Sequence, residues 1–293
     1  MRKTSERIRN LISERQDFLA QEITNRQWKR QPDLKFRYGK QGQSKCLEDA
    51  RYHLKYLSEA IGVEEAVLFT DYVAWAKVML NSRNIPTEDL VSNLEVLRDV
   101  LRDNLPHRFA KIAVAYIDAG LERLSDATLV QSTFLDEGEP LTDLAKKYLS
   151  ALLRYERRVA GAMIMEAVQR KISVKEIYSH IFERCQYEIG RLWQSNLVSV
   201  AQEHYCTAST QLIMSQLFPY IFRSEKRSTS TIVAACVSGE LHELGARMLC
   251  DFLEMEGWNT IYLGANVPTP GIVNVLLNNN CLLYTSDAAD DLT

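Results

Sequence analysis

The six cysteines of this 293-residue chain include no Cys-x-x-Cys pair. That spacing argues against a structural zinc site, and it argues equally against the disulfide framework of a small secreted domain. Cysteines that serve neither purpose behave as small hydrophobic side chains, so we expect most of them to be buried. Neither a zinc centre nor a disulfide scaffold is therefore expected.

The sequence also lacks the features that take a chain to a membrane or to nucleic acid. No uninterrupted apolar run is long enough to span a bilayer, and Met1-Arg2-Lys3 leads into a charged amphipathic segment instead of the apolar core of a signal peptide. The formal net charge is -3, and no clear helix-turn-helix pattern is present. We expect a cytoplasmic protein with neither a membrane nor a direct nucleic-acid partner.

Residues 1–125 predict a helical domain of unassigned role. Apolar residues recur at helical spacing over residues 47–61 and 65–80, and Gly62 is placed to end the first of these helices. The polar, glycine-containing residues 31–44 predict a loop. No motif in this domain names a ligand.

One face of the helix predicted over residues 65–80 is aromatic. Phe69, Tyr72 and Trp75 follow one another at three-residue steps, so they share a face. Such a stripe is more often part of a core than the floor of a ligand pocket. A pigment site with a linear tetrapyrrole near Trp75 is the alternative.

A polar, acidic stretch over residues 126–140 is a plausible domain boundary, and residues 141–222 then predict a bundle of four helices. The third helix begins at Ser173 and the fourth at Ser199. Each of these serines opens a capping box, Ser-Val-Lys-Glu in the first case and Ser-Val-Ala-Gln in the second.

Three side chains near the junction of the last two predicted helices could meet. Trp193 ends one helix, and Glu203 and His204 lie about one turn into the next. A short connector makes the two helices antiparallel neighbours, so all three side chains can face one cavity. Taken alone, a tryptophan near a helix end is usually core, and a Glu-His pair is usually an exposed polar step.

A metal-ligand loop is indicated after residue 230. The β-branched residues 231–233 lead into an apolar strand with His242 at its C-terminal end, and an amphipathic helix follows. Open α/β sheets bind ligands in the crevice outside the carboxyl ends of their strands. Glu240 is placed to hold the second nitrogen of the His242 ring, and Gly245 lets the helix start pack close to a ligand. Residues 253–267 predict the rest of a parallel βαβ unit.

This loop resembles a known family motif. Glu240-x-His242-x-x-Gly245 resembles the Asp/Glu-x-His-x-x-Gly motif of the cobalamin-binding domain family. The resemblance implies a mainly α chain in which the four-helix bundle is a cobalamin cap and residues 230–280 begin a doubly wound, Rossmann-like cobalamin-binding domain. It also implies that His242 is the lower axial ligand of the cobalt, with Glu240 and Gly245 beside the cofactor.

The bundle carries a second resemblance. Trp193, followed after nine residues by Glu203-His204, resembles the subset of that family that binds adenosylcobalamin as a light sensor. The resemblance implies that Trp193 is a flat wall on the upper face of the cofactor and that Glu203 accepts hydrogen bonds from its ribose or adenine. His204 would take the upper cobalt position after light breaks the cobalt–carbon bond.

The end of the chain is interpreted as a scar. Residues 281–291 resemble the in-frame translation of a common sequencing-library adapter, so we interpret residues 281–293 as a non-native tail, with a natural polar tail as the alternative. Two strand-like runs follow Ser230, and the family's later Ser-x-Leu and Gly-Gly motifs are absent. We therefore expect residues 230–280 to be a truncated sheet domain that binds its cofactor weakly.

These motifs favour a non-enzymatic sensor that binds adenosylcobalamin and responds to light. Its signal would pass through a homo-oligomer or a downstream signalling protein. The alternative is a corrinoid carrier protein of a methyltransferase system, which would bind methylcobalamin. A cobalamin sensor indifferent to light, and a two-chromophore photoreceptor with the additional tetrapyrrole, are further alternatives.

Overall fold

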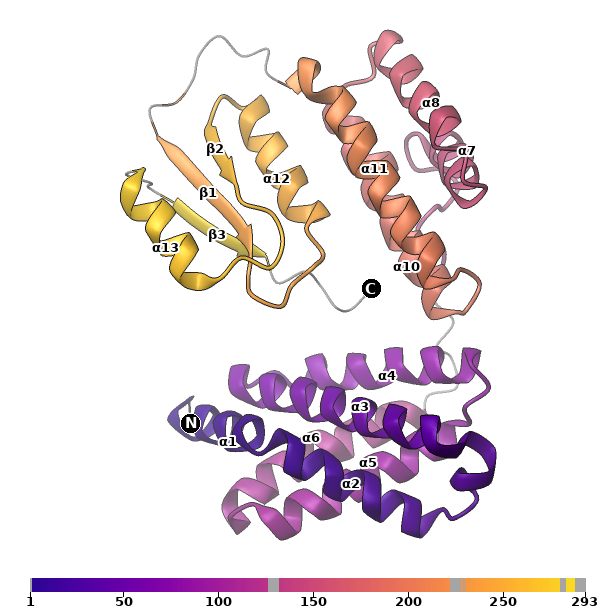
Figure 1. Cartoon of the computed structure of the whole chain (residues 1–293), viewed down its shortest axis with the longest axis vertical. Coiled ribbons are helices and arrows are strands. Elements are labelled where there is room, and N and C mark those ends of the chain that lie inside the picture. The colour runs from indigo at the N-terminus through magenta and orange to yellow at the C-terminus, as the bar shows by residue number, and fades with distance from the viewer. Residues whose placement is uncertain (1, 126–131, 222–227, 229, 280–282, 288–293) are drawn as a thin grey trace. The chain divides into compact units, whose positions relative to one another are not determined.

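The computed structural model describes residues 2–125, 132–221, 228, 230–279 and 283–287 (Figure 1). The chain divides into two compact units, unit 1 within residues 1–130 and unit 2 within residues 131–291. None of the described helices is long and apolar enough to cross a membrane. Each unit encloses its own hydrophobic core, as independent domains do.

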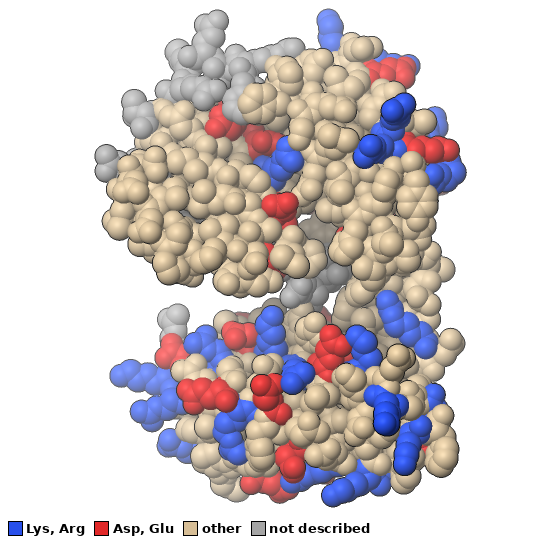
Figure 2. Space-filling view, viewed as in Figure 1, with Lys and Arg blue, Asp and Glu red and all other residues tan. Residues whose placement is uncertain are grey.

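Unit 1 is entirely helical in its described part. Its helices are α1 (Arg2–Glu14), α2 (Gln16–Arg30), α3 (Leu34–Val63), α4 (Ala66–Ser82), α5 (Thr87–Asn104) and α6 (His107–Ser125). Phe69 and Tyr72 lie in the core that these helices enclose, and Trp75 packs against it from a partly buried position. On the face seen in Figure 2, charged side chains of both signs are interspersed over this unit, in keeping with the small net charge.

The structure corrects the loop predicted over residues 31–44. Helix α3 begins at Leu34 and continues through most of that segment, with a kink at Gly39, whose φ of 59° and ψ of -160° are not helical. Only glycine adopts such a conformation readily, so one residue absorbs the bend that the sequence pattern suggests for a whole loop. Gly62 does not end the helix either, because α3 continues to Val63 and Glu64 takes the left-handed conformation with φ of 63°.

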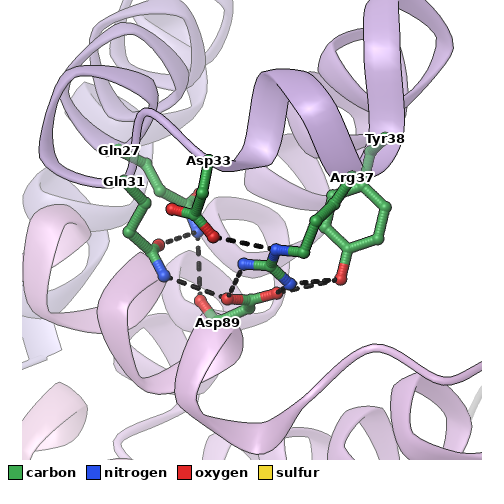
Figure 3. Close-up of polar contacts among 6 residues, drawn as sticks. All are labelled: Gln27, Gln31, Asp33, Arg37, Tyr38 and Asp89. Carbon is green, nitrogen blue, oxygen red and sulfur yellow. Dashed lines mark hydrogen bonds and ion pairs between the residues drawn. The ribbon is translucent and has the colours of Figure 1, made fainter.

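Asp89 near the start of α5 fixes the part of α3 that precedes the kink (Figure 3). Its carboxylate accepts hydrogen bonds from both terminal nitrogens of Arg37, at 2.7 and 2.9 Å, from the Tyr38 hydroxyl at 3.0 Å and from the Gln31 amide at 2.9 Å. Burial alone would raise the pKa of Asp89, but the hydrogen bonds from Arg37 and Tyr38 lower it on balance. The first turns of α3 are therefore tied to α5 by a charge-assisted cluster.

The first part of unit 2 is a four-helix bundle, referred to below as the cap. Its elements are α7 (Thr142–Leu153), α8 (Arg157–Gln169), a continuous rod of α9 (Val174–Ile177), the π-helical stretch η1 (Tyr178–Glu183) and α10 (Arg184–Gln194), and finally α11 (Val200–Ile221). Both predicted capping boxes are present. Ser173 exchanges hydrogen bonds with Glu176, and Ser199 exchanges them with Gln202.

The second part of unit 2 is a small parallel sheet flanked by helices. Its elements are β1 (Thr231–Cys236), α12 (Leu244–Met255), β2 (Asn259–Tyr262), α13 (Thr269–Asn278) and β3 (Leu283–Asp287). The strand order is β2-β1-β3, and Val233 at the centre of β1 pairs with Ile261 on one side and Tyr284 on the other. Helix α12 connects β1 to β2 on one side of β1, and α13 connects β2 to β3 on the other side. Because both parallel crossovers are right-handed but run in opposite directions, α12 and α13 cover opposite faces of the sheet (Figure 1).

The predicted fold class is confirmed. A helical N-terminal unit, a four-helix cap and the start of a doubly wound α/β domain follow one another along the chain. One strand was not predicted: β3 lies in residues 281–293, the segment interpreted as a non-native tail, and it pairs with β1 all the same. The non-native origin of that segment stays a prediction.

Candidate functional site

The loop after β1 lies at the C-terminal end of the parallel strands. Gly239 has a φ of 91° there, and its N–H donates a hydrogen bond to Asn266 Oδ1 at 2.8 Å. The N–H of Asn266 in turn donates to the carbonyl of Glu240 at 2.9 Å. The loops that follow β1 and β2 are thus joined at the sheet edge where open α/β folds bind ligands.

Glu240 and His242 form a pair in this loop. Glu240 Oε1 accepts hydrogen bonds from the backbone N–H of His242 at 2.6 Å and from its ring Nδ1 at 2.7 Å. The carboxylate side chain is 10% exposed, whereas the imidazole is 67% exposed. With its proton on Nδ1, the ring carries its lone pair on Nε2, which is the atom that can donate to a metal.

The donor set at this edge fits cobalamin. Among the residues that the structure describes, no group of three or more His, Cys, Asp and Glu side chains could hold a metal ion. A lone imidazole suits a metal whose other ligands come from a macrocycle, because the protein then supplies only an axial donor. Gly245, in the first turn of α12, is exposed beside the His242 loop. The roles of His242, Glu240 and Gly245 toward a cofactor stay predictions.

Glu243, which sequence reasoning missed, is the most connected side chain of the loop. Its carboxylate accepts hydrogen bonds from the Gln211 amide at 2.8 Å, from the Tyr262 hydroxyl at 3.0 Å and from the backbone N–H of Ala265 at 3.0 Å. Burial, followed by the hydrogen bond to Glu243, raises the pKa of Tyr262, so its hydroxyl is a donor at neutral pH. These partners lie on α11, at the end of β2 and in the loop after β2, and local sequence patterns do not reveal them.

On the cap, Glu203 and His204 form a second acidic–imidazole pair. His204 Nδ1 lies 2.8 Å from Glu203 Oε2, with the imidazole 75% exposed and the carboxylate 26% exposed. Trp193 lies half-buried at the end of α10, and the connector to α11 is short, as predicted. The convergence of Trp193 with this pair on one cavity stays a prediction.

A hydrogen-bonded chain beneath the pair ties α11 to the rest of the cap. The Thr207 hydroxyl lies 3.0 Å from Glu203 Oε1 and 3.1 Å from Gln186 Oε1, and with one proton it donates to one of these two acceptors at a time. The Gln186 amide donates to Thr210 Oγ1 at 3.0 Å, and Thr210 Oγ1 lies 3.0 Å from the buried Tyr148 hydroxyl. The contacts lead from Glu203 at the surface of α11 to Tyr148 in the cap interior.

The described cysteines of unit 2 are structural. Cys185, Cys206, Cys236 and Cys250 are buried, as predicted. Burial raises the pKa of the Cys206 thiol and of the Cys250 thiol to about 12 each. These two groups are protonated at neutral pH, so they supply neither a nucleophile nor a thiolate ligand.

Two family models match the chain, one within each unit. Residues 144–217, which lie in the cap, match a family described as the B12 binding domain. Residues 2–124 match a family described as phycobilisome protein. No curated protein matches the chain. The first match supports cobalamin binding by unit 2, and it does not distinguish the light-sensing subset from other members.

Several solved structures of corrinoid proteins are similar to the chain at low identity. A monomethylamine corrinoid protein of Methanosarcina barkeri is 15% identical, with a TM-score of 0.45 over 50% of this chain and 70% of that one. A cobalamin-binding protein of Desulfitobacterium hafniense DCB-2 is 18% identical, with a TM-score of 0.29 and the same coverage. The methanol:cobalamin methyltransferase complex MtaBC of M. barkeri is 15% identical, with a TM-score of 0.32 over 64% of this chain and 67% of that one. At these TM-scores the likeness adds nothing to the fold described above.

Proposed function

We propose that the chain is a cobalamin-binding protein in which His242 is the lower axial ligand of the cobalt. The observation that carries the proposal is the Glu240–His242 pair at 2.7 Å, located at the C-terminal edge of the strands in the unit whose cap matches the B12 binding domain. When bound, an alkylcobalamin supplies a reactive, light-sensitive cobalt–carbon bond. The chain itself is assigned no catalytic step.

In this proposal each site residue has one task. Glu240 keeps the proton on Nδ1 of His242 and thereby directs Nε2 toward the cobalt. Gly245 leaves room beside the loop, because it has no Cβ. Trp193, Glu203 and His204 of the cap would line the side of the cofactor opposite His242.

The role within this class is proposed to be that of an adenosylcobalamin light sensor. The specific support is the exposed His204 beside Glu203 on the first turns of α11, since an exposed imidazole can become an upper ligand. Signal output would then pass to a second copy or to a downstream signalling protein. The alternative is a carrier of methyl groups between methyltransferases, which needs access to the upper face and no upper imidazole.

Spectra of the loaded chain separate these roles. After loading with adenosylcobalamin in the dark and exposure to green light, the wild-type chain should reach a stable spectrum unlike that of the photolysed cofactor alone. His204→Ala should bind in the dark and lose that difference. His107→Ala, an exposed histidine of unit 1, is the control. Identical light products for the wild type and His204→Ala would exclude the sensor role, and methyl transfer from the methylcobalamin-loaded chain would favour the carrier.

A second proposed function is the binding of a linear tetrapyrrole by unit 1. The observation that favours it is the match of residues 2–124 to the phycobilisome protein family. The partly buried Tyr56 and Trp75, which pack against the core of the same unit, could contact a flat pigment: they lie 3.9 and 6.4 Å from the ring of the buried Tyr72, measured between ring centroids. Burial raises the pKa of the Cys46 thiol to about 11, so the pigment is proposed to be held without a covalent bond.

Biliverdin is a suitable probe for this second function. The wild-type chain should shift and sharpen the red absorption band of added biliverdin, and denaturation should release the pigment intact. Trp75→Ala should weaken the shift at least severalfold, whereas Trp258→Ala, in unit 2 and outside the match, should not. An unchanged biliverdin spectrum with the wild-type chain would exclude this function.

A further inference from the structure

The contact between α12 and the cap extends along the whole helix. Glu243, just before α12, and Arg247 of α12 face Gln211 and Ser215 of α11: the Gln211 amide donates to Glu243, and Arg247 donates to Ser215 Oγ at 2.8 Å. Glu243 and Arg247 are four residues apart, as are Gln211 and Ser215, so each pair lies on one face of its helix segment. The two faces therefore lie against each other. Further along, the Tyr178 hydroxyl of η1 donates to an oxygen of the Asp251 carboxylate at 2.7 Å.

Apolar side chains fill the space between these polar pairs. Met248 is buried in the hydrophobic core of the cap, and Leu244, Phe252 and Met255 pack against that core. A displacement of the cap therefore acts on α12 as a whole. The residue that precedes α12 is Glu243, and the residue before that is His242.

Glu243 does not serve as an ordinary helix cap. The side chain at the N-cap position of a helix, most often Ser, Thr, Asp or Asn, usually accepts a hydrogen bond from an N–H group of the first turn. Glu243 makes no such bond, although it occupies the N-cap position of α12. One carboxylate oxygen instead accepts from Gln211 on the cap, and the other accepts from Tyr262 and Ala265 on the sheet side. The side chain is a bridge between the two parts of unit 2.

We propose that Glu243 is a positioning residue that couples the cap to the His242 loop. Through Gln211 it senses the position of α11, the helix that also carries Glu203 and His204, and through Tyr262 and Ala265 it holds the loop. The inference rests on the proposed function, because it concerns the ligand loop of that site. Coupling of this kind is reciprocal: whatever moves the cap loosens the loop, and whatever fixes His242 favours the docked cap.

Exchanging the carboxylate at position 243 with the amide at position 211 separates the coupling of the cap to the loop from a general change in stability. Glu243 accepts at both oxygens, whereas Glu243→Gln presents an amide N–H₂ to one of its donors. That contact is lost, or is kept only as a neutral bond when the Gln211 amide turns its oxygen toward it, and either way the charge-assisted bond is gone. Adding Gln211→Glu reverses the polarity of the pair. The carboxylate introduced at position 211 accepts from the amide introduced at position 243, and the amide's carbonyl oxygen still faces the sheet side. The double variant therefore restores the bridge with the original net charge, and it closes a double-mutant cycle with Glu243→Gln and Gln211→Glu as the single variants.

Hydrogen exchange of the chain without cofactor is the first readout. Glu243→Gln and Gln211→Ala should each speed exchange in residues 237–243 about tenfold, the size expected for loss of one hydrogen bond to a charged group. The swapped double variant should restore slow exchange. Ser215→Ala removes the contact of Arg247 and the bond from the Ser215 hydroxyl to the Gln211 carbonyl, but no partner of the Glu243 carboxylate, so it should leave the loop unchanged.

The second readout is the share of chains in which a histidine nitrogen binds cobalt, measured by electron paramagnetic resonance after loading with cob(II)alamin. This share should fall in Glu243→Gln and recover in the double variant. If Gln211→Ala leaves loop exchange unchanged, or if the double variant fails to restore it, the coupling is refuted. If exchange behaves as expected but no chain, the wild type included, shows histidine ligation, the coupling stands and the proposed lower-ligand role of His242 fails.

Discussion

The Glu240 carboxylate accepts hydrogen bonds from the backbone N–H of His242 at 2.6 Å and from its ring Nδ1 at 2.7 Å. Partners of this kind orient a metal-binding imidazole and raise its basicity. Glu240→Gln should therefore lower cobalamin affinity about tenfold to a hundredfold. Glu240→Asp, which keeps the charge, should retain most of the affinity. Equilibrium titration followed by absorbance measures both, and equal affinity of the wild type and Glu240→Gln would contradict this role.

Asp49 of α3 makes the stability of unit 1 depend on pH. Burial, with a contribution from Glu48, raises its pKa from 3.8 to about 6. Between these two values the folded chain keeps a proton that the unfolded chain has released, so stability falls as the pH rises through this window. The cost at pH 8 is at most about 3 kcal/mol, since each pKa unit is worth about 1.4 kcal/mol.

Asp49→Asn removes this cost. The variant should melt at a higher temperature than the wild type at pH 8 and at nearly the same temperature at pH 4. Burial also lowers the pKa of His53 from 6.5 to about 4, which opposes folding in acid, but that cost is common to both chains and cancels in the comparison. A stabilisation of equal size at both pH values would contradict the assignment.

Single residues of the site differed in how well they could be predicted. The Glu240–His242 contact spans two residues of sequence, so a local motif was enough to suggest it. Glu243 was missed because its amide partner, Gln211, is 32 residues away on another element. Contacts of that length depend on how elements pack, and a single sequence does not record the packing.

At the scale of elements, the Asp89 cluster fixes how α3 starts. Asp89→Asn should lower the free energy of unfolding of unit 1 by about 2 to 4 kcal/mol, because it leaves the half-buried Arg37 guanidinium without its main partner. Asp33→Asn is the matched control. Asp33 contacts the same guanidinium but is 62% exposed, so its loss should cost less than about 1 kcal/mol. Urea unfolding followed by circular dichroism compares the two, and equal losses would contradict the assignment.

Elements with strong local signals were predicted well. Both capping boxes start helices where the Ser-x-x-Glu and Ser-x-x-Gln patterns place them. The segment around Gly39 was predicted as a loop because it is polar, although long-range anchoring by Asp89 lets a kinked helix form there. Strand β3 was missed because its pairing with β1 uses backbone groups that every residue has.

At the scale of the whole molecule, each of the two units has its own hydrophobic core and matches its own family model. Cobalamin should therefore stabilise unit 2 selectively. At a concentration of adenosylcobalamin about a hundredfold above the dissociation constant, binding adds about 2.7 kcal/mol to the unit that binds it. Hydrogen exchange followed by mass spectrometry should slow in residues 141–279 and stay unchanged in residues 2–125. Protection confined to residues 2–125 would contradict the placement of the site.

The central claim is that His242 donates its Nε2 to cobalt, and isotope labelling tests it most directly. Cob(II)alamin bound to the chain should show a triplet nitrogen splitting in its electron paramagnetic resonance spectrum, and labelling the protein's histidines with nitrogen-15 should turn the triplet into a doublet. His242→Ala should show no effect of the label. A wild-type spectrum that keeps its triplet after labelling would mean that an unlabelled nitrogen, such as that of the cofactor's own base, occupies the lower position, and the assignment of His242 would be wrong.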